Sequence, residues 1–237
     1  MKYATAPSLA PTFIDVMRHG EPEGICEHGG MILRGSIDHA LTDKGWLQAK
    51  SRIESLESWD VVVSSPLVRC SAFAHWVVSE NKSAHPNAIL KESWRELHYG
   101  DWEGLSTHDI WKESPELMGK LWQQPLEFCA PNGESVKDFG QRIEDAWASL
   151  LDEFQGKRIL LVCHGGVMRV LLQQLLSMAP EAMNRFAIPY AAMSRFRVDH
   201  SISKHSKSEH SIKNNERQDW PSLITHLGDE CVKGEGL

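Results

Sequence analysis

The stretch FIDVMRHG at residues 13–20 decides the fold, because it joins a short apolar run to a polar end. The run is almost continuously apolar over residues 13–17 and ends in Arg18 and His19. Runs of this length without polar alternation are typical of strands buried on both faces of a parallel sheet. Residues 60–63 and 158–163 have the same character. The three runs together predict a mainly parallel central sheet.

Helical signals follow each of these runs. Thr42 can cap a helix after the first strand, Pro66 suits the first position of a helix after the second, and residues 167–177 form an apolar helix after the third. Ser135 begins a further helix, whose apolar residues repeat at intervals of three and four as far as Phe154. Because strand and helix alternate, we expect a three-layer α/β/α fold with helices on both faces of the sheet.

The carboxyl-terminal part has a different pattern. Residues 194–198 and 222–226 have the composition of two short strands, and we predict that they form a hairpin at the edge of the sheet. The polar residues 199–219 between them are expected to form a flexible connection. Since no repeat or linker divides the chain, residues 1–237 are predicted to form a single domain.

Charge and cysteine content narrow the class of protein. The formal net charge of −7 argues against a nucleic-acid partner, which normally requires a basic surface. The five cysteines are odd in number and form no CxxC pair, so we expect neither a disulfide scaffold nor a zinc site. The sequence has no apolar run typical of a signal peptide or a membrane span. We therefore expect a cytoplasmic protein without a membrane partner, and a homodimer stays open.

The polar ends of the three strands contain the residues for phosphate chemistry. Arg18 and His19 follow the first strand, Arg69 lies shortly after the second, and His164 follows the third. The carboxyl ends of parallel strands meet at one edge of a sheet, so these side chains are expected to converge. Arginine binds phosphate oxygens through two parallel hydrogen bonds, and a neutral imidazole can attack phosphorus. The pattern predicts a phosphoryl-transfer site in which these donors can balance the phosphoryl charge without a metal, and we expect no cofactor.

A leaving alkoxide also needs a proton. The segment WRELHYGDWEG at residues 94–104 contains three carboxylic acids that could supply it. They are Glu96, Asp101 and Glu103. The residues themselves do not choose among the three.

Six motifs occur in an order that resembles the histidine phosphatase superfamily, the phosphoglycerate mutase-like group, over roughly residues 13–198. They are VMRHGE at 16–21, RGSID at 34–38 running into LTDKGWLQA at 41–49, SSPLVRC at 64–70, RELHYGDWEG at 95–104, PNGES at 131–135 and VCHGG at 162–166.

The resemblance implies the family's fold, its metal-independent chemistry and a role for each of six residues. These are His19 as the nucleophile, Arg18, Arg69 and His164 as the phosphate clamp, Glu96 as the proton donor, and Arg34 as a further substrate or phosphate contact.

The segment between Glu96 and Pro131 is short and contains only two lysines, Lys112 and Lys120. In this respect the chain looks more like small phosphatases such as α-ribazole phosphatase than like mutases, which carry longer basic insertions there. We therefore expect a phosphomonoesterase that hydrolyses a small phosphorylated metabolite through a phosphohistidine intermediate. The alternatives are a phosphoglycerate mutase-type phosphotransferase and a catalytically idle module that binds a phosphorylated ligand.

Overall fold

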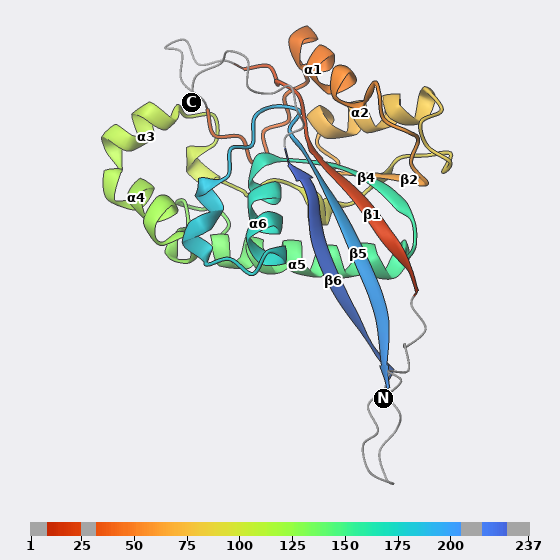
Figure 1. The fold of residues 1–237 in the computed structure, drawn as a ribbon. Helices are drawn as coiled ribbons and strands as arrows, with labels where there is room; N and C mark the ends of the chain where they lie inside the picture. Colours follow the sequence, from red (N-terminus) through yellow and green to blue (C-terminus); the bar gives the residue numbers. More distant parts are fainter. Residues whose placement is uncertain (1–8, 25–31, 205–214, 227–237) are drawn as a thin grey trace.

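A six-stranded sheet forms the centre of the protein in a computed structural model, which describes residues 9–24, 32–204 and 215–226 (Figure 1). The strand order is β3-β2-β4-β1-β5-β6. The strands are β1 (Leu9–Arg18), β2 (Val61–Ser64), β3 (Ile89–Leu90), β4 (Arg158–Cys163), β5 (Met193–Lys204) and β6 (Asn215–His226). The first four strands pair in parallel, while β5 pairs antiparallel with β1 and β6 antiparallel with β5. The predicted mainly parallel sheet with an edge hairpin is confirmed.

Helices cover both faces of this sheet, as predicted. They are α1 (Asp43–Ile53), α2 (Val68–Ser79), α3 (Thr107–Glu113), α4 (Pro115–Gln123), α5 (Val136–Glu153) and α6 (Gly165–Leu175), with short 3₁₀ helices η1 (Glu92–Trp94), η2 (Gly100–Trp102), η3 (Pro125–Glu127) and η4 (Pro180–Arg185). Val62 and Leu160 of the sheet pack in one apolar cluster with α1 and α2, whereas Val63 and Leu161 pack in another with α5 and α6. Adjacent residues of one strand therefore enter different cores, which is why the strands are apolar throughout.

Two helices begin at other residues than the sequence predicts. Helix α2 was expected to begin at Pro66, but it begins at Val68, because the Asp38 carboxylate accepts the Val68 N–H at 2.6 Å and caps the helix from a distant loop. Helix α6 begins at Gly165, two residues before the expected start, and its first turn is closed by the Met168 N–H on His164 O at 3.1 Å. By contrast, Thr42 and Ser135 cap α1 and α5 as expected.

The edge hairpin is longer than predicted. Residues 199–204 and 215–219, expected to be a flexible connection, continue strands β5 and β6, which extend past the helices as an arm (Figure 1). The remainder of that stretch lies outside the described residues. Buried polar side chains hold the arm to the body: Thr12 Oγ1 donates to His200 Nε2 at 2.7 Å and accepts the Gly156 N–H at 2.8 Å. His200 Nδ1 in turn lies 2.6 Å from Asp219 Oδ1. Thr12, His200 and Asp219 are ordered because each provides a hydrogen-bond partner for the next.

Among the helices within the described ranges, none is long and apolar enough to cross a lipid bilayer.

Candidate active site

The candidate site lies where β1, β2 and β4 end side by side. The His19 N–H donates to Cys163 O at 3.0 Å, and the Ser65 N–H donates to Val162 O at 3.0 Å, so the residues after each strand start level with one another. This end of the sheet borders a cavity of about 100 Å³. Its walls include Arg18, His19, Arg34, Glu96, Arg169 and Tyr190. The structure thus brings together the residues that follow β1, β2 and β4, and the loop that carries Glu96 reaches the same cavity.

His19 has the tautomer and charge of a nucleophile. Its ring Nδ1 lies 2.7 Å from Gly20 O, and a carbonyl oxygen only accepts, so Nδ1 carries the proton and Nε2 keeps a free lone pair. The side chain is 5% exposed. Burial, followed by the positive charges of Arg18 and Arg69, holds the pKa of His19 well below its usual value. The ring is therefore neutral at pH 7.

His164 lies directly beside the nucleophile and is fully buried. The two imidazole rings are 5.3 Å apart between centroids, at an angle of 66°. Arg69 Nε donates to His164 Nδ1 at 3.3 Å, which leaves the proton on Nε2, 2.8 Å from Ser65 Oγ. Burial and the Arg69 charge also hold the pKa of His164 well below its usual value. It is a second neutral imidazole with one N–H to donate.

Arg69 is buried behind the cavity rather than in its wall. Its Nη1 donates to Ile37 O at 2.7 Å and its Nη2 to Gly35 O at 2.9 Å, in addition to the bond from Nε to His164. A single guanidinium thus ties the 34–37 loop to the second histidine. Direct contact between Arg69 and phosphate, which the family resemblance implies, would require these bonds to be exchanged.

Two other predicted arginines line the cavity itself. Arg18 lies over the ring of Tyr190, with its Cζ 4.2 Å from the ring centroid, and its Nη1 donates to Ile188 O at 2.5 Å. The Nε of Arg18 is buried and has no hydrogen-bond partner among the described residues. Arg34 donates to His39 Nδ1 at 3.3 Å and to the carbonyl of Gly24. Both guanidiniums are placed to meet an anion in the cavity.

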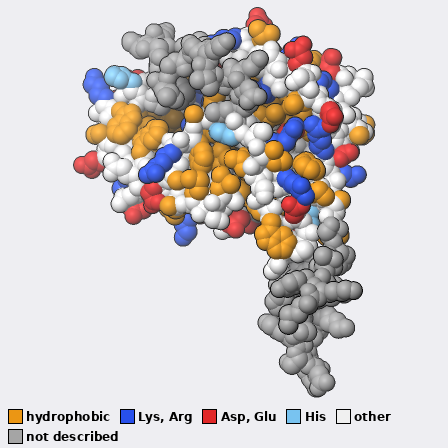
Figure 2. Space-filling model, viewed as in Figure 1, with side chains coloured by type: hydrophobic (Ala, Val, Ile, Leu, Met, Phe, Trp, Pro, Cys, Tyr) orange, Lys and Arg blue, Asp and Glu red, His pale blue; other side chains and the backbone are white. Residues whose placement is uncertain are grey.

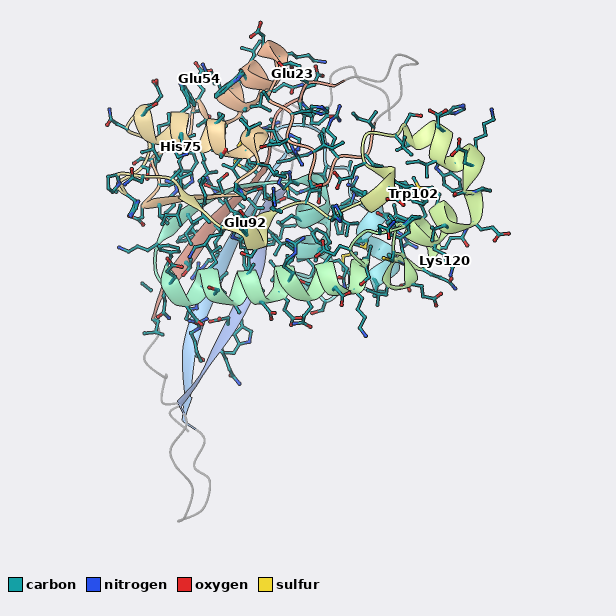
Figure 3. All side chains as sticks on the ribbon, turned by 180° about the vertical axis from the view of Figure 1, so that it is seen from behind. Glu23, Glu54, His75, Glu92, Trp102 and Lys120 are labelled. Carbon is teal, nitrogen blue, oxygen red and sulfur yellow. The ribbon has the colours of Figure 1, made fainter. Side chains whose placement is uncertain are left out.

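Glu96 is the one of the three candidate carboxylates that lines the cavity. Its Oε2 accepts the Gly166 N–H at 2.9 Å, and its Oε1 accepts the Leu97 N–H at 3.1 Å. The loop that carries it runs from Glu92 to Trp102 (Figure 3). Arg142 of α5 donates to the backbone carbonyl of Arg95 at 3.0 Å and to that of Glu96 at 3.4 Å, which holds this loop against the helix.

The two other carboxylates are used elsewhere. Asp101 is exposed and accepts from Asn132 Nδ2 at 2.9 Å. Glu103 accepts the N–H groups of Ser36, Ile37 and Tyr99 and the Ser36 hydroxyl, all within 3.2 Å. Burial raises the pKa of Glu103, but these bonds outweigh that effect and lower the pKa overall, and they hold the 34–37 loop in place.

Three arginines, Arg18, Arg34 and Arg169, line this cavity. On the face shown in Figure 2, basic and acidic side chains are interspersed. Among the residues that the structure describes, no group of three or more His, Cys, Asp or Glu side chains is arranged to hold a metal ion.

The model of one family, the histidine phosphatase superfamily (branch 1), matches residues 14–206. The chain belongs to this superfamily. The adenosylcobalamin/α-ribazole phosphatase of Escherichia coli (strain K12) is 32% identical over 177 residues, which cover 73% of this chain and 83% of the relative. A phosphoglycerate mutase of Schizosaccharomyces pombe is 28% identical over 70% of this chain and 80% of its own.

Solved structures of this superfamily share the fold. The crystal structure of a putative α-ribazole-5'-P phosphatase from Escherichia coli K-12 superposes with a TM-score of 0.70, at 25% identity, over 94% of this chain and 99% of that chain. Because the superfamily relatives include both phosphatases and mutases, membership supports phosphoryl chemistry at the level of the family.

Arg169 and Tyr190 are among the side chains of this histidine phosphatase cavity that sequence reasoning missed. Arg169 lies five residues after His164, and side chains on a helix lean toward its amino terminus, so its position could have been found from the helical period. No local pattern marks Tyr190, because the loop before β5 brings it to the cavity from a distant part of the chain.

Proposed function

We propose that this histidine phosphatase superfamily member hydrolyses a small phosphomonoester through a phosphohistidine formed on His19. The observation that carries the proposal is the hydrogen bond from His19 Nδ1 to Gly20 O, in a ring kept neutral by burial. It leaves the Nε2 lone pair for attack on phosphorus. Arg18 and Arg34 line the same cavity and can balance the charge on the phosphoryl oxygens.

In the first step, the Nε2 lone pair of His19 forms a bond to phosphorus while the bond from phosphorus to the leaving oxygen breaks. Glu96 in its protonated form gives its proton to that oxygen, so the alcohol leaves neutral. The ring becomes positively charged as it takes the phosphoryl group. The Gly20 carbonyl, which accepts from Nδ1, stabilises that charge.

In the second step, Glu96 removes a proton from water, and the water oxygen attacks phosphorus as the N–P bond breaks. Phosphate leaves, His19 is neutral again, and Glu96 has recovered its proton. His164 would give its Nε2–H to a phosphoryl oxygen in exchange for its present acceptor, Ser65 Oγ. We assign to Arg69 the task of positioning His164 and the 34–37 loop, in keeping with its buried bonds.

The test is substitution of the nucleophile. His19→Ala is expected to abolish hydrolysis of p-nitrophenyl phosphate and the acid-labile labelling of the protein by a radioactive phosphomonoester. His75→Ala is the matched control, since His75 is exposed on α2 away from the cavity (Figure 3). A His19→Ala protein that still turns over substrate, or a wild-type protein that never becomes labelled, contradicts the proposal.

Transfer of the phosphoryl group back to substrate is the second candidate, because several relatives are phosphoglycerate mutases. Incubation with 3-phosphoglycerate and a trace of 2,3-bisphosphoglycerate separates the two reactions. A phosphatase releases free phosphate, whereas a mutase produces 2-phosphoglycerate. A panel of phosphorylated metabolites that includes α-ribazole 5'-phosphate then addresses the substrate.

A further inference from the structure

Arg169 is a charged residue in an otherwise uncharged helix. Helix α6 has the sequence GGVMRVLLQQL, and the residues on either side of Arg169 are buried and apolar. The Arg169 side chain runs back along the helix: a methyl group built on Gly165 would lie 3.5 Å from its Nη1. The guanidinium therefore reaches the amino-terminal end of α6, where that helix borders the cavity.

This guanidinium has no partner within the described part of the chain. Arg169 forms no hydrogen bond or ion pair there, and its Nε is shielded from solvent. The same holds for the Nε of Arg18. The two arginines approach each other, because the methyl group built on Gly165 would lie 3.4 Å from Arg18 Nε as well. A glycine at this position leaves the space between them open.

This arrangement is unfavourable for the protein alone in three respects. Burial lowers the pKa of Arg18, and the like charge of Arg169 lowers it further. A cation near a helix amino terminus opposes the helix dipole. Buried donors without acceptors have lost their hydration without compensation. The Glu96 charge offsets part of the repulsion, but the Glu96 oxygens accept from the backbone N–H groups of Gly166 and Leu97 and not from either Nε. A bound anion between the two guanidiniums would reverse all three effects.

We propose that Arg169 and Arg18 form a pair of guanidiniums that grips the phosphoryl group from the α6 side of the cavity. This inference rests on the proposed function for the identity of the anion, a phosphomonoester or the phosphate released from it. Arg169 is then a substrate-binding residue. Arg169 and Arg18 both line the cavity, whereas the Arg69 guanidinium donates to the backbone oxygens of Ile37 and Gly35.

The test measures binding of inorganic phosphate by titration calorimetry in the full chain. Arg169→Met keeps the aliphatic stem but removes the donors, and it is expected to weaken phosphate binding by about tenfold to a hundredfold, as for loss of hydrogen bonds to a charged group. Arg169→Lys keeps the charge but loses the paired donors, so its affinity should lie between those of Arg169→Met and the wild type. Arg197→Ala is the control, since it removes one positive charge from an exposed ion pair with Asp199 on β5.

The outcomes separate this inference from the proposed reaction. Phosphate affinity within twofold of the wild type in Arg169→Met, or wild-type protein that binds no phosphate, overturns the inference. If Arg169→Met does not fold, as judged by thermal unfolding, the same comparison is made with Arg169→Lys alone. Wild-type protein that binds phosphate but forms no phosphohistidine contradicts the proposed hydrolysis through His19. In that case the ratio of the phosphate affinities of the wild type and Arg169→Met still decides the role of Arg169.

Discussion

Gly166→Ala places a methyl group against the carboxylate that we propose as the proton donor. The new Cβ would lie 2.3 Å from Glu96 Oε1 and 3.0 Å from Cδ, whereas ordinary contacts begin at 3.4 Å. The carboxylate is the free end of a flexible side chain, so it moves and the helix stays. It must retreat by about 1 Å, and a displacement of that size can lower a rate on the order of 10²-fold, or about 2.7 kcal/mol.

The assay compares two leaving groups. An alkyl phosphate needs a proton on its departing oxygen, whereas p-nitrophenolate leaves readily without one, so kcat should fall on the order of 10²-fold for the alkyl ester and much less for p-nitrophenyl phosphate. Alanine favours a helix over glycine by roughly 0.5–1 kcal/mol, so Tm should not fall. Gly119→Ala in α4, with open space around it, is the matched control. Equal losses for both substrates, or no loss for either, would refute the reasoning.

Three further predictions concern the surroundings of the site and the arm. Glu103→Gln should lower the free energy of unfolding by about 1–3 kcal/mol with kcat nearly unchanged, while Glu96→Gln should lower kcat for alkyl esters on the order of 10²-fold or more. If steady-state assays showed the larger loss of kcat in Glu103→Gln, Glu103 and not Glu96 would be the proton donor. The pKa values of His19 and His164 are depressed in the folded state, so the unfolded state binds more protons below about pH 6.5. The free energy of unfolding should therefore decrease as the pH is lowered below about 6.5, by up to about 1.4 kcal/mol per pH unit for each histidine. Urea unfolding measures this slope, which His164→Asn should reduce. Thr12→Val leaves the buried His200 Nε2 of the arm without its donor and should lower stability by about 1–3 kcal/mol, with kcat unchanged; an unaltered denaturation midpoint would contradict this.

Local sequence was sufficient to locate the three buried parallel strands β1, β2 and β4 and the residues that end them, but not β3 or the full length of β5 and β6. Strand β4 covers the predicted residues 158–163, and the predicted cap residues Thr42 and Ser135 begin α1 and α5. Burial on both faces demands a continuous apolar run, and parallel pairing brings the ends of such runs to one edge. The positions of His19 and His164 follow from these two rules alone.

The local chemistry of the sequence did not separate Glu96 from Asp101 and Glu103, which lie within eight residues of one another; the family resemblance favoured Glu96, and the tertiary structure shows that Glu96 is the one that lines the cavity. The difference comes from partners distant in the chain, namely Gly166 for Glu96 and Ser36 for Glu103. Arg69 and Arg169 likewise differ in their hydrogen-bond acceptors: Arg69 donates to the backbone oxygen of Ile37, whereas the Nε of Arg169 has no acceptor among the described residues. Strand and helix formation depends on periodicities carried by neighbouring residues, whereas the role of a polar side chain depends on which distant groups surround it once the chain has folded.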